Sequence, residues 1–382
     1  MHNEQLNAKV DFMDKTDRTH SPAREAEVYG TGFSDKLEPL EALDLRKCNT
    51  VSDLVNGMGK TAFGGRSVGE AADLLYDMAA DKDVFTIMTM SGAMTMAKMG
   101  LVICDMIETG MIQAVVSTGA LITHGLIETM GMRHFKYRPG QMNDEELYLK
   151  GYDRVYDTLE LEKNLDDTEE VVHAIFKEEQ PEKMCSRSIC ESIGKYLHKN
   201  VPGRGALKTA YEYGVPVYIP AFTDSELGLD VSIYKRFLRM NNEAEPQYDP
   251  FLDLDDLTER FIGSRKQGIF TIGGGVPRNW AQQIAPYLEI RDMRLGIKLP
   301  VKRYQFGIRI CPEPVHLGGL SGCTYSEGVS WGKFVPASRG GRFVEVISDA
   351  TIAWPMIVRA VMERMEKNGI KSKNKLKPGD GK

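Results

Sequence analysis

The sequence lacks the cysteine patterns of a disulfide-rich or zinc-binding protein. Its six cysteines are scattered without a CxxC pair, and the closest two, Cys185 and Cys190, are separated by four residues. We therefore expect reduced, structural thiols, which are typical of a cytoplasmic protein. The first twenty residues are polar and charged, without the apolar core of a signal peptide, and this agrees with a cytoplasmic location.

Long uncharged hydrophobic runs and an excess of one charge are also missing. The most apolar stretch, residues 87–116, contains Lys98, Asp105 and Glu108, so we expect no membrane span. The 48 basic and 54 acidic residues give a net charge of −6, which offers no basic field for nucleic acid. With 42% hydrophobic and 27% charged residues, the 382-residue chain has the composition of a globular protein of one or two domains.

Several familiar motifs are absent. The chain has no Walker A pattern and no G-x-G-x-x-G. No pair of histidines has a local metal-ligand spacing, and from spacing alone we expect no metal site.

Short apolar segments followed by small residues and then by helical periodicity recur along the chain, which is typical of βαβ units. Six such segments predict a doubly wound, mostly parallel, Rossmann-like α/β sheet with helices on both faces. They lie in residues 83–90, 113–120, 214–228, 267–284, 304–310 and 342–350.

The domain plan has three parts. Residues 1–45 are expected to form an N-terminal arm, 46–366 a single large catalytic domain, and 367–382 a Lys-rich flexible tail, with a docking arm as the second interpretation. Periodicity predicts helices over 64–80 and 94–108. The charged stretch 141–200 is interpreted as helices on the surface of the sheet.

Ligands of open parallel sheets bind at the carboxyl ends of the strands. The candidate cofactor residues at those ends are Gly92, Thr118, Gly119, Asp224, Gly274, Gly275 and Asp349. The glycines could let a phosphate approach the backbone, or they could simply make tight turns. Either aspartate could accept ribose hydroxyls or hold an amine, or could cap a helix.

The densest segment is HLGGLSGCTYSEGVSWGKF, residues 316–334. A lysine in apolar and aromatic surroundings loses solvation, and its pKa falls toward that of a useful amine nucleophile. Lys333 is therefore the candidate catalytic residue, with Glu327 to hold a cation and Trp331 to cover it. The alternative is a surface lysine beside a packing tryptophan.

These segments resemble the deoxyhypusine synthase family, whose catalytic lysine lies in a VSWGK run. The resemblance covers roughly residues 50–365. It is carried, in order, by TAFGGRSVGEAADLL (61–75), VVSTGA (115–120), PVYIPAFTDSELG (216–228), IFTIGGGVPRNWAQ (269–282), GGLSGCTYSEGVSWGK (318–333) and VISDATIAWPMIV (346–358).

The resemblance implies a Rossmann-like fold, NAD as cofactor, and a homotetramer with sites at subunit interfaces. Family members oxidise spermidine, hold its 4-aminobutyl group as an imine on the lysine, and transfer it to a lysine of translation initiation factor 5A. By that resemblance Lys333 is the nucleophile and Glu327 and Trp331 hold the polyamine. The strand-end residues, including Thr118, Asp224, Asp349 and the 273–275 turn, hold NAD.

The chain departs from the family pattern at positions expected to bind the polyamine substrate. Asn279 stands where the eukaryotic enzymes have an active-site histidine, and His124 stands at a family glutamate. Two polyamine-binding aspartates correspond to Leu229 and Leu320, with Asp230 one position from the first. We therefore include Asn279, His124 and Asp230 among the candidate substrate-binding residues.

The favoured function is an NAD-dependent aminoalkyl transfer from a polyamine to an amine acceptor, which could be a small amine such as putrescine or agmatine. One alternative is authentic deoxyhypusine synthesis on factor 5A. Others are a non-catalytic NAD or polyamine sensor and a plain NAD-dependent dehydrogenase, which would not need Lys333.

Overall fold

The computed structural model describes residues 29–297 and 301–377. The chain divides into two units, residues 1–41 and 42–382. The described part of the first unit contains a turn in which Leu37 N donates to Gly32 O at 2.9 Å. Every helix and strand of the described residues lies in the second unit, which begins at residue 42.

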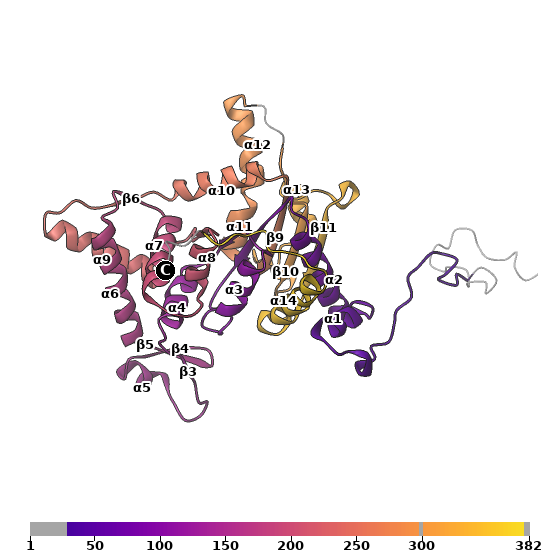
Figure 1. Ribbon diagram of the computed structural model, residues 1–382, viewed down its shortest axis with the longest axis horizontal. Coiled ribbons are helices and arrows are strands. Elements are labelled where there is room, and N and C mark those ends of the chain that lie inside the picture. Colours follow the sequence, from indigo (N-terminus) through magenta and orange to yellow (C-terminus); the bar gives the residue numbers. More distant parts are fainter. Residues whose placement is uncertain (1–28, 298–300, 378–382) are drawn as a thin grey trace, which may run out of the picture. The chain divides into compact units, whose positions relative to one another are not determined.

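Six parallel strands form the central sheet of the second unit (Figure 1). They are β1 (Val84–Met90), β2 (Ala114–Val116), β7 (Val217–Tyr218), β9 (Lys266–Ile272), β10 (Phe306–Ile310) and β11 (Arg342–Val346). Each overlaps one of the six predicted segments, so the predicted doubly wound parallel sheet is confirmed. Their spatial order is β11-β10-β9-β1-β2-β7. Strand order reverses between β1 and β9, and this is the place where doubly wound sheets bind their ligands.

Both faces of the sheet are covered, because alternate residues of the central strands enter two separate apolar clusters. Met88 of β1 and Phe270 of β9 belong to the cluster under α2, α3 and α14, whereas Ile87 and Ile269 belong to the cluster under α10, α11 and α12. These helices are α2 (Phe63–Ala80), α3 (Gly100–Glu108), α14 (Ala350–Lys367), α10 (Phe251–Gly263), α11 (Gly275–Gln282) and α12 (Ile284–Leu295). The predicted helix over 64–80 is thus confirmed in α2.

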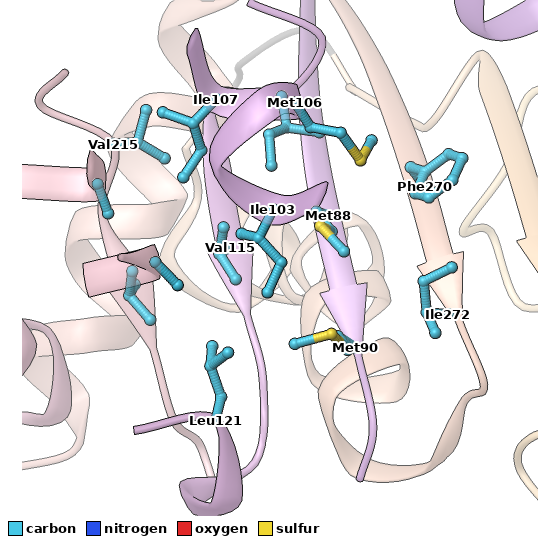
Figure 2. Packing of buried hydrophobic residues seen from close by; sticks show 14 of the residues in the cluster. Met88, Met90, Ile103, Met106, Ile107, Val115, Leu121, Val215, Phe270 and Ile272 are labelled. Carbon is cyan, nitrogen blue, oxygen red and sulfur yellow. The ribbon is translucent and has the colours of Figure 1, made fainter. Parts of the chain in front are cut away.

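Methionines fill much of the first cluster. Figure 2 shows Met88 and Met90 of β1 close to Ile103 and Met106 of α3. The indole Nε1 of Trp354 donates to the Met106 sulfur at 3.2 Å. Flexible thioether side chains suit an irregular space between a sheet and three helices.

The predicted helix over 94–108 is six residues too long. Residues 94–98 form turns, Lys98 has a φ of +64°, and α3 begins only at Gly100. A positive φ at a residue with a side chain is incompatible with a continuous α-helix. The apolar periodicity of this stretch carried no signal for that break.

The charged region 141–200 contains strands as well as helices. Its helices are α5 (Asp144–Leu149), α6 (Glu162–Glu179) and α7 (Ser186–Asn200), and its strands are β4 (Tyr152–Val155), β5 (Thr158–Leu161) and β6 (Lys183–Met184). With β3 (Phe135–Lys136), β4 and β5 make a small antiparallel sheet in the order β3-β5-β4. The sequence interpretation missed this sheet, because its short strands are too polar to show the alternation of a half-buried strand.

The remaining elements surround this framework. They are η3 (Leu45–Lys47), α1 (Val51–Gly59), α4 (Gly119–Thr129), α8 (Ala206–Glu212), α9 (Glu226–Met240), β8 (Gln247–Tyr248), η4 (Val315–Leu317), α13 (Tyr325–Ser330) and η5 (Ala337–Arg339). None of the helices in the described ranges has the length and hydropathy needed to cross a bilayer.

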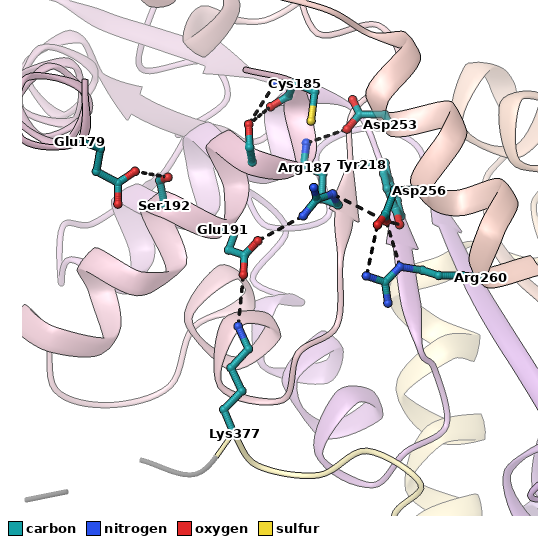
Figure 3. Close-up of polar contacts among 11 residues, drawn as sticks. Glu179, Cys185, Arg187, Glu191, Ser192, Tyr218, Asp253, Asp256, Arg260 and Lys377 are labelled. Carbon is teal, nitrogen blue, oxygen red and sulfur yellow. Dashed lines mark hydrogen bonds and ion pairs between the residues drawn. The ribbon is translucent and has the colours of Figure 1, made fainter. Parts of the chain in front are cut away.

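The described part of the expected flexible tail is attached to the domain. Lys373 Nζ donates to Met78 O at 2.9 Å and to Val84 O at 2.8 Å, and Asn374 Nδ2 donates to two carbonyl oxygens, at 2.7 and 2.8 Å. Figure 3 shows Lys377 paired with Glu191 of α7, at 3.2 Å. The described residues up to 377 are therefore held against the domain, and the last five residues lie outside the described part.

The tail attachment predicts a stability effect. Asn374→Ala removes the donors to the carbonyl oxygens of Ile107 and Ile112, and it should lower the free energy of unfolding by about 1–3 kcal/mol. The exposed neighbour provides the control, since Lys375→Ala should stay within about 0.5 kcal/mol. Urea unfolding checks both, and an Asn374→Ala protein as stable as the parent would mean that the tail does not dock in solution.

Candidate active site

The carboxyl ends of β1 and β9 are joined directly. Ser91 N donates to Ile272 O at 3.1 Å, and Gly274 N donates to Ser91 Oγ at 3.1 Å. Gly273 has a φ of +71°, and a Cβ there would lie 2.2 Å from Ser91 Oγ. Glycine is therefore required at this position for both its backbone conformation and its close approach.

The same edge of the sheet has features that suit a bound dinucleotide. Gly92 and Gly275 both have positive φ and open space where a Cβ would stand. The hydroxyls of Ser117 and Thr118, at the end of β2, are buried without a partner. Thr118 precedes the first residue of α4 but makes no side-chain cap, so its hydroxyl is available to a ligand.

The two candidate aspartates differ. Asp349 caps α14, since Thr351 N donates to its Oδ1 at 2.7 Å. Asp224 does not cap α9, because that role belongs to Ser225, and Asp224 is exposed. Helix capping, one of the two alternatives considered for both residues, is thus observed for Asp349.

Lys333 is held in a buried position by two glycine-dependent turns. Its backbone N donates to Gly328 O at 3.1 Å, and Gly332 before it has a φ of +70°. A Cβ on Gly328 would lie 2.5 Å from the Phe334 ring, so glycine lets α13 pack closely on this aromatic residue. The alternative of a surface lysine is wrong, because Lys333 is only 8% exposed.

The Lys333 amine lies in a cavity of about 270 Å³. Nζ donates to Asn279 Oδ1 of α11 at 3.0 Å. The lining residues are Asn279, Gln283, Val315, Gly318, Gly319, Leu320, Cys323, Glu327, Trp331 and Lys333. The cavity therefore brings together four of the residues chosen from the sequence, with Trp331 66% exposed at its edge. Gln283 and Cys323 were missed, since their residue types suggested no chemistry in the sequence.

Desolvation controls the charge of this amine. Burial lowers the pKa of Lys333, and the Arg278 guanidinium lowers it further, whereas Cys323 and Glu327 act in the opposite direction. Arg278 is itself buried, with Nη1 donating to Leu320 O at 3.2 Å and with Nε and Nη2 unpartnered. Arg278 is thus a further residue of the site that sequence patterns did not reveal, although it directly precedes Asn279.

Two candidate substrate-binding residues, His124 and Asp230, lie outside the Lys333 cavity of their own chain. His124 is on α4, where Nδ1 lies 3.2 Å from Glu160 Oε2. Asp230 is on α9, and burial together with the Glu169 charge raises its pKa to about 6. Neither is among the described residues that line the Lys333 cavity.

Comparison with known proteins identifies the family. The family model for deoxyhypusine synthase matches residues 53–361. The chain belongs to the deoxyhypusine synthase family. This range contains both the strand-end residues and the whole Lys333 cavity, so the family resemblance recognised in the sequence is confirmed.

Curated relatives in this family have two kinds of name. "Probable deoxyhypusine synthase 2" of Methanosarcina acetivorans is 34% identical over 328 residues, which are 85% of this chain and 90% of the relative. "Probable deoxyhypusine synthase 2" of Archaeoglobus fulgidus is 35% identical over 306 residues, covering 80% and 96%. "Deoxyhypusine synthase-like protein" of Chlorobaculum parvum is 33% identical over 322 residues, covering 84% and 88%.

A solved structure supports the fold. The crystal structure of a "putative deoxyhypusine synthase" from Entamoeba histolytica aligns with a TM-score of 0.54 at 14% identity, covering 85% of this chain and 97% of the other. At that identity the match concerns the fold, and it agrees with the Rossmann-like sheet described above.

The geometry of the site predicts how the reactivity of the Lys333 amine depends on pH. Arg278→Gln removes a buried positive charge, so the pKa of Lys333 should rise and its amine should become reactive only at higher pH. Reductive methylation across pH, with the Lys333 peptide followed by mass spectrometry, measures this shift.

The exposed Arg265→Gln serves as the matched control and should leave the Lys333 profile unchanged, as long as circular dichroism shows every variant folded. A profile for Arg278→Gln that coincides with the parent, or moves to lower pH, would contradict the role given to Arg278.

Proposed function

We propose that the protein catalyses an NAD-dependent transfer of an aminoalkyl group, the 4-aminobutyl group of a polyamine such as spermidine, to an amine acceptor through an imine on Lys333. The single observation that carries the proposal is the desolvated Lys333 amine in a cavity, donating to Asn279 Oδ1. Membership of the deoxyhypusine synthase family supports the reaction class.

Lys333 attacks in its neutral form. Desolvation lowers the pKa of the ammonium, so a larger fraction of the amine carries a free electron pair near neutral pH. The hydrogen bond to Asn279 Oδ1 uses one N–H of Lys333 and so orients the free electron pair on Nζ. Glu327 and Trp331 lie on the same cavity and are suited to hold a cationic polyamine, by ion pairing and by cation–π contact.

The transfer balances in four steps. The polyamine loses a hydride from the carbon beside its secondary nitrogen and a proton from that nitrogen, which leaves an imine. Lys333 Nζ then bonds to that carbon and the remaining diamine leaves. An acceptor amine next displaces Lys333, and the stored hydride with a proton reduces the product imine. The lysine is regenerated, and no net oxidation remains.

NAD fits the carboxyl edge of the sheet as the hydride carrier. It supplies reversible hydride storage between the two halves of the reaction. We assign its binding to Gly92, Thr118, Gly119, Asp224, Gly274, Gly275 and Asp349. Support comes from the open space at Gly92 and Gly275 and from the unpartnered Thr118 hydroxyl.

A small amine is the favoured acceptor. Glu327 is the single carboxylate among the described residues lining the cavity, and Leu320 occupies a position where the family has a polyamine-binding aspartate. A cavity with few carboxylates attracts a polycation less strongly. Putrescine or agmatine would then accept the group, giving a homospermidine-type product.

A homotetramer in the cytoplasm is part of the same proposal. Because family sites lie at subunit interfaces, Asp230 could reach the amine from a second copy, although it lies outside the cavity of its own chain. The His124 imidazole, 3.2 Å from Glu160 and only 10% exposed, is enclosed within its own chain.

Authentic deoxyhypusine synthesis on factor 5A is the second candidate, favoured by the relatives named as synthases. The distribution of label between a small amine and factor 5A distinguishes the two candidate functions. The protein is incubated with NAD and spermidine labelled in its aminobutyl group, together with putrescine and a factor 5A from the same organism. We expect label in a small triamine, and label in the factor would favour the second candidate.

Lys333→Ala should abolish transfer in either case, whereas Lys367→Ala, at the end of α14, should not affect it. Unchanged transfer by Lys333→Ala would overturn the lysine mechanism. A folded parent protein that transfers no label to either acceptor would favour the NAD or polyamine sensor.

Because Leu320 stands where the family has an aspartate, a carboxylate restored at this position should raise the affinity for spermidine. Leu320→Asp should tighten spermidine binding about fivefold, since an added ion pair contributes on the order of 1 kcal/mol at an aqueous edge. Calorimetry with spermidine checks this, and Met293→Asp, exposed on α12, is the control. Equal affinities in the Leu320→Asp variant and the parent would show that Leu320 does not face the amine.

A further inference from the structure

Three metal-ligating side chains meet beside α4, away from the Lys333 cavity. His124 comes from α4, His134 from the residue before β3, and Glu160 from β5. Their ligand atoms all lie within 4.8 Å of one another. The side chains of His124, His134 and Glu160 are 10%, 0% and 1% exposed, so the group is enclosed by protein.

The spacing is close to that of a bound ion. Glu160 Oε2 lies 3.2 Å from His124 Nδ1 and 2.5 Å from His134 Nε2. In a tetrahedral zinc site with bonds of about 2.0–2.1 Å, neighbouring ligand atoms are about 3.3 Å apart. A movement of the His134 ring by less than about 1 Å would bring its Nε2 to that distance from Glu160 Oε2.

Two hydrogen bonds to its other oxygen orient the Glu160 carboxylate. Asn164 Nδ2 and Leu161 N donate to Glu160 Oε1 at 2.7 and 2.9 Å, which leaves Oε2 facing the two imidazoles. In metal sites, hydrogen bonds of this kind hold the coordinating side chains in the orientation that binds the ion.

A second carboxylate increases the local negative charge. Asp153 of β4 pairs directly with Glu160 of β5 across the small sheet, and like charges directly opposite destabilise a sheet. The Oδ2 atom of Asp153 is buried without a partner. A divalent cation at Glu160 would relieve this repulsion.

We propose that His124, His134 and Glu160 bind a divalent transition metal ion, zinc by its ligand preference, which fastens α4 to the β3-β5-β4 sheet. Two imidazoles and one carboxylate are a recurrent ligand set for such ions. Since α4 begins at Gly119, next to the unpartnered Thr118 hydroxyl, the ion would also steady that edge of the central sheet.

Lys98 competes with the ion in this arrangement. Its Nζ lies 2.5 Å from His134 Nδ1 and 3.8 Å from Glu128 Oε1. An ammonium can only donate, so His134 then carries its proton on Nε2, the atom that must bind metal. Zinc binding therefore moves that proton to Nδ1 and turns Lys98 toward Glu128.

The test uses the full chain, treated with a chelator and then titrated with zinc by calorimetry, with metal content measured after desalting. We expect one zinc ion per chain. Glu160→Gln and His134→Gln should weaken binding about tenfold or more. The matched controls Glu162→Gln and His173→Gln, which change the same residue types outside the cluster, should bind like the parent.

Two further readouts keep the outcome clear. Lys98→Asn removes the competing cation, tolerates the positive φ at this position and should tighten zinc binding. Cobalt in place of zinc should give the intense visible absorption of a four-coordinate site in the parent but not in Glu160→Gln.

Circular dichroism confirms that each variant is folded without metal. A folded parent that binds no zinc, or a Glu160→Gln variant that binds zinc as tightly as the parent, would overturn the proposal and leave a hydrogen-bonded His–Glu–His cluster. Either result leaves the lysine mechanism untouched, because none of these measurements depends on transferase activity.

Discussion

The removal of one ammonium group from water is the constraint on which the active site depends. Lys333 is buried because α13 packs closely on Phe334 through Gly328, and its amine is oriented because α11 presents Asn279 to it. The helix α11 is itself placed by the 273–275 turn at the end of β9. The nucleophile and the proposed cofactor edge are therefore positioned by the same strand, and a shift of β9 would disturb both.

Burial is the main cause of the lowered pKa of Lys333, and the Arg278 guanidinium acts in the same direction. A buried guanidinium without a carboxylate partner is costly. Among the described residues, Arg278 is stabilised by the Leu320 carbonyl and by contact with the Tyr325 ring, 5.4 Å from the ring centre. Beside Lys333 it disfavours a second positive charge, which is what an amine nucleophile requires.

Much of the fold could be predicted because its signals are local. The six strands follow from short apolar runs, four of which end in glycine or serine, and α2 follows from its apolar face. The break at Lys98 and the small β3-β5-β4 sheet could not be predicted, because one depends on a single backbone angle and the other on pairing between polar segments. The same applies to the tail, where Lys373 and Asn374 bond to carbonyl oxygens that a sequence does not reveal as available.

The candidate site shows the same division. Glu327, Trp331 and Lys333 lie within one short motif, and Asn279 follows a glycine turn, so their meeting in one cavity agrees with the sequence. Arg278 and Gln283 had no such context. His124, His134 and Glu160 lie 10 and 26 positions apart along the chain and meet only through the small sheet, so a search for local histidine spacing gave no indication of this cluster.

The most direct test of the account is covalent capture at Lys333. The protein is incubated with NAD and spermidine, reduced with borohydride, digested and examined by mass spectrometry. We predict that the peptide containing Lys333 gains the mass of an aminobutyl group on that residue, and only when NAD is present. An unmodified Lys333, or an adduct that forms equally well without NAD, would contradict the proposed mechanism.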